Sequence, residues 1–320
     1  MSHLHTAEGK VILLGEHAVV YGHPALVTGI SGGATARAKS AGRSCLILSG
    51  TQHFPDEGEI GTAFAALLQT LDVEATLVEA ELLLPAGFGL GASAALGVAI
   101  ARATLAQSAF ARLPQSSQNE WVTVAAQSWE TVFHGTPSGI DVTAAARGGC
   151  FQFTRGDGPK PVPIAKPLRL AIAIVGPNVS TKAMVLAVAQ LRDKKPTVVD
   201  QTMQSISALV QNARLALEAG DLLTLGKLMD LNQMLLSGLF LSTERLELAC
   251  QIARDAGALG AKLTGKGGGG CVIALCDGTP DAVLAAWKAH NIECFAALVP
   301  TQSPSTQSPP YDESSEICTG

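Results

Sequence analysis

The sequence predicts an α+β protein in which short strands and longer helices do not alternate regularly. Short apolar runs punctuated by glycine, histidine or proline, such as KVILLG (10–15) and ALVTGI (25–30), are typical of strands. Longer stretches with apolar residues near helical spacing, such as residues 116–134, are typical of amphipathic helices. Because these segments do not follow a strict strand–helix–strand order, an α+β arrangement is favoured over a doubly wound sheet.

The first half of the chain contains most of the expected strands. Each strand is a short apolar run that ends in turn-forming residues, as ELLLP ends at Pro85. Each helix is a longer run rich in alanine, leucine or glutamine. The expected strands cover residues 10–15, 25–30, 34–40, 44–50 and 81–85, and the expected helices cover 61–79, 93–112 and 116–134.

The second half is expected to be a separate, mostly helical domain. TRGDGPKPVPIAKP (154–167) is rich in glycine and proline and marks the junction, so we expect domains over residues 1–160 and 161–300. Residues 301–320 are rich in serine and proline and are expected to form a disordered tail. The expected strands are 168–177, 271–276 and 293–299, and the expected helices are 181–193, 197–219, 221–237, 242–257 and 279–290.

Composition excludes several classes of function. The net charge is -5, which argues against broad binding of nucleic acid or anionic membranes, although a small anionic ligand remains compatible. The seven cysteines form no CxxC pair, so neither a disulfide framework nor a zinc site is expected. We expect the cysteines to be reduced thiols in a cytoplasmic protein. The N-terminus lacks a signal-peptide pattern, and no apolar run is long enough to span a membrane. The oligomeric state stays open, a homodimer included.

The stretch PAGFGLGASAAL (85–96) places three alternating glycines directly before a helix-forming run. Glycine lets a backbone turn sharply and approach a ligand closely, and the following helix points its first N–H groups at that loop. Together these features favour a phosphate site, with the Ser93 hydroxyl available as a helix cap or as a metal ligand. A tight loop with a capping serine is the alternative interpretation. The stretch lacks the Walker pattern, and Ala92 stands where a dinucleotide-binding motif needs its third glycine.

A second glycine cluster, KLTGKGGGGCVIAL (262–275), has four consecutive glycines, which are costly to order on folding. Close packing of this backbone against a ligand or another loop explains them better than a flexible connection does.

With GKVILLGEHAVVYGHPAL (9–26), these two stretches complete an ordered set of three motifs. The set resembles that of the GHMP kinases over residues 9–276, and the first motif has the form found in the members that phosphorylate mevalonate. ETVFHGTPSGID (130–141) and STKAMV (180–185) are similar to further family segments. The resemblance implies an N-terminal domain like ribosomal S5 domain 2, a ferredoxin-like C-terminal domain, and an active site in the cleft between them.

The function that the resemblance implies is ATP- and Mg²⁺-dependent phosphorylation of the primary hydroxyl of mevalonate, giving 5-phosphomevalonate for isoprenoid biosynthesis. It places the catalytic base at Asp141, since a carboxylate can accept the proton of the attacking hydroxyl. Lys10 would hold that carboxylate ionised, and Ser93 and Glu130 would bind the metal ion. Without the resemblance, Asp141 would be interpreted as a helix cap, Lys10 as a solvated lysine and Glu130 as an exposed helical glutamate.

The resemblance also implies which residues bind the nucleotide and the acceptor. ATP phosphates would be bound by the backbone of Gly87, Gly89, Leu90, Gly91, Ala92, Ser93 and Ala94. The acceptor would be bound by Glu16, His17, Arg155, Thr181 and Lys266, with the Arg155 guanidinium suited to a carboxylate. His17 can equally be structural, and Arg155 can equally lie in a surface turn.

Two positions depart from the family pattern. Ala92-Ser93 stands where many members have two serines, but the serine at the metal position is retained. Lys266 replaces the alanine of TGAGGGG and would add a positive charge near the reaction centre, or point into solvent. Lys266 therefore keeps two alternatives open, another GHMP small-molecule kinase (acting on phosphomevalonate, homoserine or a mevalonate-like acid) and a non-catalytic ligand sensor on the same fold.

Overall fold

The computed structural model describes residues 3–135, 137–176 and 179–303. Its N-terminal half is built on a seven-stranded sheet centred on β2 (Ala25–Ser40). β1 (His5–Leu14) pairs antiparallel along one edge of β2, while β5 (Thr76–Leu82) and β6 (Cys150–Thr154) share the other edge. The sheet is completed by β3 (Cys45–Leu48), β4 (Thr51–His53) and β7 (Gly158–Pro161), in the order β4-β3-β5-β2-β6-β7.

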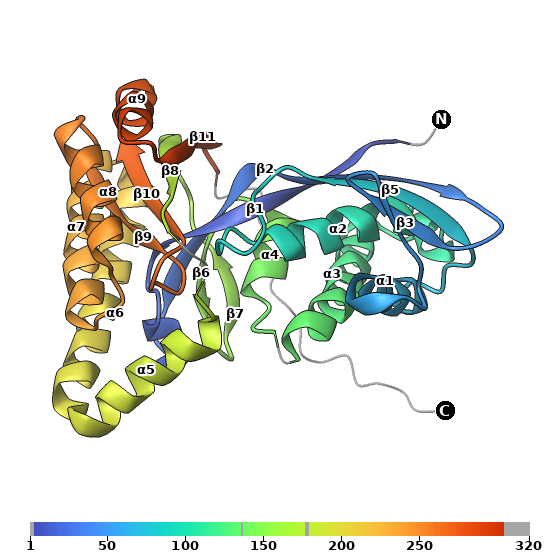
Figure 1. The fold of residues 1–320 in the computed structure, drawn as a ribbon, viewed down its shortest axis with the longest axis horizontal. Coiled ribbons are helices and arrows are strands. Elements are labelled where there is room, and N and C mark those ends of the chain that lie inside the picture. The colour runs from blue at the N-terminus through green and yellow to red at the C-terminus, as the bar shows by residue number, and fades with distance from the viewer. Residues whose placement is uncertain (1–2, 136, 177–178, 304–320) are drawn as a thin grey trace.

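Helices cover one face of this sheet (Figure 1). The central helix α2 is almost entirely buried, because it packs on the sheet on one side and against α3 on the other. Gly97 permits the second contact, since a Cβ there would lie 2.8 Å from Cδ1 of Trp129. The elements are α1 (Gly58–Thr70), α2 (Ala92–Leu105), α3 (Gln115–His134), α4 (Ile140–Arg147) and the short 3-10 helices Ala18–Tyr21 and Ala109–Arg112.

The structure corrects three expectations for the first half. The helix expected over 61–79 is wrong beyond Thr70, where α1 ends; the alternating burial of β5 gives the two-residue period of a strand instead. The strands expected over 25–30 and 34–40 form one continuous strand, β2. Gly33 does not form a turn but allows β1 and β2 to approach closely, since a Cβ there would lie 2.5 Å from the Gly9 nitrogen. The expected helix 93–112 ends at Leu105.

The C-terminal half contains a four-stranded antiparallel sheet in the order β11-β8-β10-β9. Numbered along the chain, this is the 4-1-3-2 order of a ferredoxin-like sheet, as the family resemblance implied. β9 was not expected from the sequence as a strand. The strands are β8 (Leu168–Ile174), β9 (Gly260–Thr264), β10 (Cys271–Cys276) and β11 (Glu293–Val299), and the helices are α5 (Thr181–Lys194), α6 (Pro196–Ala219), α7 (Leu222–Gly238), α8 (Glu244–Asp255) and α9 (Asp281–Ala289).

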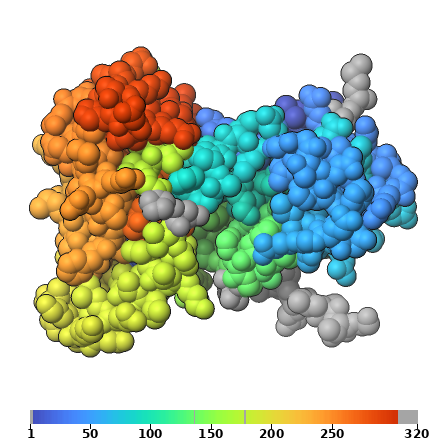
Figure 2. All heavy atoms as spheres, in the orientation of Figure 1, coloured from blue at the N-terminus to red at the C-terminus, as the bar shows by residue number. Residues whose placement is uncertain are grey.

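One hydrophobic cluster joins the two halves, which lie side by side in Figure 2. It combines Leu13 of β1 and Leu26 of β2 with Leu170 of β8, Ile273 of β10 and Val210 of α6. The change from one sheet to the other falls between β7 and β8. We propose that the domain boundary lies in this connection and separates two sheets that share part of their core.

The described end of the chain is anchored rather than free. The Gln302 side chain accepts a hydrogen bond from the Cys150 backbone at 2.9 Å, and its backbone pairs with Ile164. The disorder expected from residue 301 therefore does not apply to residues 301–303, and residues 304–320 lie outside the described residues. Among the described helices, none has the length and apolar character needed to cross a membrane. The six described cysteines are free thiols.

Two glycines of α7 provide a matched test of this packing. A Cβ at Gly226 would lie 2.3 Å from the Leu259 carbonyl oxygen, whereas a Cβ at Gly238 meets open space. We expect Gly226→Ala to lower the free energy of unfolding by about 1–3 kcal/mol through overpacking. Gly238→Ala should raise it by up to about 1 kcal/mol, because alanine favours a helix. Chemical denaturation of both variants measures the difference, and equal stabilities would contradict the packing described here.

Candidate active site

A glycine-rich loop connects β5 to α2 and lies against β1. Gly87, Gly89 and Gly91 all have positive φ values (86°, 80° and 72°), which L side chains rarely adopt. The backbone N–H of Lys10 donates a hydrogen bond to the Leu90 carbonyl at 2.8 Å, which fixes the loop to β1. The loop is therefore a defined structure, with a conformation that requires its glycines.

The N-terminus of α2 leaves backbone donors available at this loop. Its first intrahelical bond runs from the Ala95 N–H to the Gly91 carbonyl at 2.9 Å, and no side chain caps the helix. The N–H groups of Ala92, Ser93 and Ala94 therefore have no acceptor within the helix. Together with the helix dipole, these donors are suited to bind an anion.

The side chains of Ser93 and Glu130 meet beside this helix end. The Ser93 hydroxyl donates to Oε1 of Glu130 at 2.5 Å, and the Trp129 indole N–H lies 3.3 Å from the same hydroxyl. The other Glu130 oxygen lies 3.6 Å from Nε2 of His134. Burial raises the pKa of the Glu130 carboxyl, so a cation bound here would favour its ionised form.

This pair supplies oxygen ligands but is not a complete metal site. Within the described ranges, no group of three or more His, Cys, Asp or Glu side chains is placed to hold a metal ion. A carboxylate and a hydroxyl oxygen fit the preference of Mg²⁺, which commonly takes its remaining ligands from substrate phosphates and water. The donor set therefore fits Mg²⁺ that arrives with a nucleotide.

Lys10 and Asp141 form an ion pair. Nζ of Lys10 lies 3.2 Å from Oδ1 of Asp141, and the lysine side chain is 7% exposed while the aspartate is 42% exposed. Asp141 lies in the first turn of α4, whose N-cap is Gly139 with a φ of 79°. Asp141 is thus not the helix cap, and its carboxylate is stabilised by both Lys10 and the helix dipole while staying accessible.

The second glycine cluster forms the turn between β9 and β10 and faces the first loop. A Cβ built on Gly270 would lie 3.4 Å from the Phe88 carbonyl oxygen, and one on Gly265 would lie 4.0 Å from that of Gly89. The Gly268 N–H also donates to the Leu241 carbonyl at 2.8 Å. As expected from the sequence, these glycines serve a close approach of backbones, here between the N-terminal and C-terminal halves.

His17 is fixed by this turn. Its Nε2 lies 2.8 Å from the carbonyl oxygen of Lys266. Burial lowers the pKa of His17, and the carbonyl can only accept, so the neutral ring donates from Nε2. His17 also has a positive φ of 59°, which the surrounding contacts must hold in place.

Glu16 differs from the substrate contact that the sequence predicted. It is fully buried and forms an ion pair with Lys262 of β9, while the Asn232 side-chain amide donates to its other oxygen at 3.2 Å. Because both carboxylate oxygens bind groups of the protein itself, Glu16 stabilises the structure around the site and is not a substrate contact. Lys262 and Asn232 were missed from the sequence; the only signal was a charged residue within an otherwise buried strand.

The two remaining candidates lie at the surface. Arg155 lies in the turn between β6 and β7, and Thr181 is the first residue of α5. Both are exposed, and neither has a hydrogen bond or ion pair to the other site candidates among the described residues. The structure therefore brings together the loop, Lys10, Asp141, Ser93, Glu130, His17 and the Lys266 backbone, but not these two.

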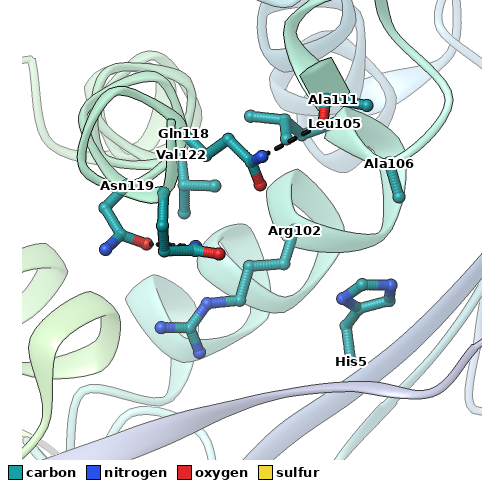
Figure 3. A pocket seen from close by; sticks show the side chains of 9 residues that line it. His5, Arg102, Leu105, Ala106, Ala111, Gln118, Asn119 and Val122 are labelled. Atoms are coloured by element: carbon teal, nitrogen blue, oxygen red, sulfur yellow. Dashed lines mark hydrogen bonds between the residues drawn. The ribbon is translucent and has the colours of Figure 1, made fainter. Parts of the chain in front are cut away.

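A separate cleft of about 440 Å³ lies at the opposite end of α2 and contains none of the predicted site residues. His5, Arg102, Gln118 and Asn119 are among the residues that line it (Figure 3). Arg102 donates to the backbone carbonyls of Thr6 and Ala146, so its guanidinium is used in structural contacts.

The buried pair behind the site makes a stability prediction. Lys262→Met leaves the Glu16 charge buried without its cation, so we expect the free energy of unfolding to fall by about 3–5 kcal/mol. The double change Glu16→Gln with Lys262→Met should recover most of that loss, because no buried charge remains. Arg214→Met, which breaks the partly exposed pair with Glu218, should cost less than about 1 kcal/mol. A double variant no more stable than Lys262→Met alone, in chemical denaturation, would contradict this account.

Comparison with known proteins identifies the family. Residues 60–149 match the GHMP kinases N terminal domain, and residues 213–293 match the GHMP kinases C terminal model. The mevalonate kinase of Aeropyrum pernix is 34% identical over 287 residues, covering 84% of this chain and 87% of that protein. The mevalonate kinase of Pyrococcus abyssi is 32% identical over 317 residues, covering 89% and 92%.

Solved structures agree with this assignment. L. major mevalonate kinase in complex with R-mevalonate superposes with a TM-score of 0.85 at 31% identity, over 95% of this chain and 97% of that one. The Methanococcus jannaschii mevalonate kinase superposes with a TM-score of 0.80 over 94% and 99%, but at 23% identity it shows the fold alone. This chain therefore belongs to the GHMP kinase family, and the two relatives described above, which match 84% and 89% of it, are mevalonate kinases.

Proposed function

We propose that this protein phosphorylates the primary hydroxyl of mevalonate with ATP, giving 5-phosphomevalonate for isoprenoid biosynthesis in the cytoplasm. The observation that carries the proposal is the accessible Asp141 carboxylate, held 3.2 Å from Lys10 beside the open N-terminus of α2. A proton acceptor and an anion site next to each other are what phosphoryl transfer to an alcohol requires. The mevalonate kinases of Aeropyrum pernix and Pyrococcus abyssi, which match 84% and 89% of this chain, support mevalonate as that alcohol.

In this proposal the first glycine loop binds the polyphosphate of ATP through its backbone. The N–H groups of Ala92, Ser93 and Ala94 donate to phosphate oxygens, since no helical carbonyl accepts from them. Gly87, Gly89, Leu90 and Gly91 shape the loop around the phosphates. These donors are fixed before the reaction begins, so they stabilise developing negative charge without reorganising.

Ser93 and Glu130 would hold Mg²⁺ together with the phosphates. When bound, the ion would offset the negative charge of the transferred group and of the departing ADP. The protein's own contribution is to keep the Ser93 hydroxyl and the Glu130 carboxylate in contact beside the helix end.

Asp141 accepts the proton of the mevalonate hydroxyl as its oxygen attacks the γ-phosphorus. The new O–P bond forms while the bond from the γ-phosphorus to the bridging oxygen of ADP breaks, so the transfer is direct. Lys10 pairs with Asp141 before the reaction and stabilises the alkoxide character that develops on the hydroxyl oxygen.

We propose that His17, Arg155, Thr181 and Lys266 lie on the acceptor side. His17 and Lys266 share a hydrogen bond at the inner end of the site. The exposed Arg155 and Thr181 would reach mevalonate only from the rim, where a guanidinium can pair with the carboxylate. Glu16 is left out of the substrate contacts, because Lys262 and Asn232 already engage both its oxygens.

A non-catalytic sensor is disfavoured by the same geometry. A sensor needs to bind a nucleotide, but it does not need an ion-paired and accessible carboxylate beside the phosphate site. Other GHMP kinases share the fold, including Lactococcus lactis galactokinase with a TM-score of 0.71 at 19% identity. A structural match at 19% identity shows the fold but does not indicate the substrate. The match to galactokinase therefore does not favour galactose as the acceptor.

The proposed base is tested by Asp141→Asn. The amide cannot accept the hydroxyl proton, so we expect kcat to fall by at least about 100-fold, while calorimetry should show nearly unchanged ATP affinity. Asp157→Asn, an exposed change in the β6–β7 turn, is the matched control. Turnover of the Asp141 variant close to that of the unmodified protein would rule out the assigned base.

The acceptor is tested by comparing kcat/KM for mevalonate, phosphomevalonate, homoserine and galactose with ATP and Mg²⁺. We expect mevalonate to be preferred over each of the others by at least about 100-fold, because a site built for one set of polar groups rejects analogues that leave them unpaired. A higher kcat/KM for another acceptor would reassign the substrate, and ATP binding without transfer to any of them would support the sensor.

A further inference from the structure

The Ser93 hydroxyl is held by two neighbouring side chains of α3. It donates a hydrogen bond to Oε1 of Glu130 at 2.5 Å, and it accepts one from Nε1 of Trp129 at 3.3 Å. Trp129 and Glu130 are both buried, with 1% and 3% of their surface exposed, whereas Ser93 is half-buried. The two contacts therefore fix the hydroxyl from the interior of the N-terminal half.

These contacts leave a defined binding capacity on the Ser93 oxygen. A serine hydroxyl has one proton to donate and two lone pairs that can accept. In this structure the proton goes to Glu130 and one lone pair accepts the Trp129 N–H, so one lone pair remains. A hydroxyl oxygen in contact with a carboxylate is the kind of ligand set that Mg²⁺ prefers. The indole thus decides which way the remaining lone pair is directed.

The surface of α2 gives the indole access to this hydroxyl. Gly97 lies four residues after Ser93, on the same side of the helix. A Cβ at Gly97 would lie 2.8 Å from Cδ1 of Trp129, and Cδ1 is the ring carbon bonded to Nε1. The Trp129 ring also packs against Phe133, with 5.4 Å between the ring centroids. The missing side chain at Gly97 therefore lets the edge that carries the N–H reach Ser93.

Trp287 of α9 shows what a buried indole does without such a partner. It is as buried as Trp129, and its Nε1 donates to the backbone carbonyl of Ala249 at 2.9 Å. A buried indole N–H needs an acceptor, and a backbone carbonyl is sufficient. The Trp129 N–H is bound instead to a side-chain hydroxyl that the proposed function assigns to the metal ion. The two tryptophans therefore form a matched pair for an experiment.

We propose, on the basis of the function proposed above, that Trp129 is a positioning residue that orients the Ser93 hydroxyl for Mg²⁺. Its N–H occupies one lone pair while Glu130 takes the proton, which leaves the other lone pair for the ion. Trp129 acts through Ser93, since an indole N–H can only donate and cannot bind a cation. Removing a group that orients a metal ligand typically lowers metal affinity or activity by about 10- to 100-fold.

The experiment uses the full chain with Trp129→Phe and the control Trp287→Phe. Each change removes one buried indole N–H and part of one ring, so chemical denaturation should show similar losses of stability. Calorimetry with ATP and Mg²⁺ should show an affinity lowered about 10-fold by Trp129→Phe and unchanged by Trp287→Phe. With ATP and EDTA, both variants should bind like the unmodified protein, because the N–H groups at the start of α2 are unaffected.

A double-mutant cycle tests whether Trp129 acts through Ser93. In Ser93→Ala protein the indole has no hydroxyl to orient, so adding Trp129→Phe should change the affinity for ATP with Mg²⁺ by less than about 2-fold. The same loss in both backgrounds would overturn the proposal. So would an unchanged affinity of Trp129→Phe, or an equal loss with Mg²⁺ and with EDTA, since an equal loss indicates a general disturbance of α3 and the loop.

Gly97→Ala decides the question if Trp129→Phe does not fold. The added methyl group would displace the indole from Ser93, so we expect the same loss of ATP affinity with Mg²⁺ only, and an unchanged affinity would contradict the proposal. If the unmodified protein binds ATP equally with Mg²⁺ and with EDTA, the metal assignment and this proposal both fail. If binding depends on Mg²⁺ but none of the four acceptors is phosphorylated, the proposed function fails, and the affinities still decide the role of Trp129.

Discussion

The site depends on the contact between β1 and the first glycine loop. The Lys10 N–H donates to the Leu90 carbonyl at 2.8 Å, and the glycines Gly9 and Gly91 favour this close approach. A Cβ on Gly9 would lie 3.0 Å from the Leu90 carbonyl oxygen, and one on Gly91 would lie 2.8 Å from Cγ of Lys10. Because the backbone of Lys10 fixes the loop while its ammonium pairs with Asp141, one residue links the glycine loop to the proposed proton acceptor.

The segment after β1 attaches the two halves of the molecule to each other. Glu16 pairs with Lys262 of β9, and His17 donates to the backbone of the β9–β10 turn. The ring of Tyr21 lies under the Arg192 guanidinium of α5, 5.0 Å from centroid to carbon. Glu16, His17 and Tyr21 thus contact β9, the β9–β10 turn and α5 of the C-terminal half. This explains how the glutamate of the motif can be important for the site without contacting the substrate.

The sequence predicted the candidate site residues better than the residues that support them. Glycines before a helix and a family motif around Asp141 sufficed to select the glycine loop and Asp141 as candidates, because both motifs consist of residues close together in the chain. The partner of Glu16 could not be predicted in this way, since Lys262 is 246 residues away and pairing across that distance depends on the fold. Local patterns also failed for β5, where propensity favoured a helix and pairing with β2 and β3 imposed a strand.

Two helices that begin at the site, α2 and α4, start from a glycine in the left-handed conformation, Gly91 and Gly139. Neither N-cap supplies a side-chain acceptor, which is also the case for α1, α3, α5, α6 and α9. A glycine at the N-cap in place of a capping serine or aspartate costs roughly a few tenths of a kcal/mol in the free protein. The hydroxyl that could have capped α2, that of Ser93, is bonded to Glu130 instead. The unbonded N–H groups of α2 and the Ser93–Glu130 pair therefore belong to one arrangement. Because the Ser93 hydroxyl binds Glu130, the N–H groups at the start of α2 stay available to an anionic ligand.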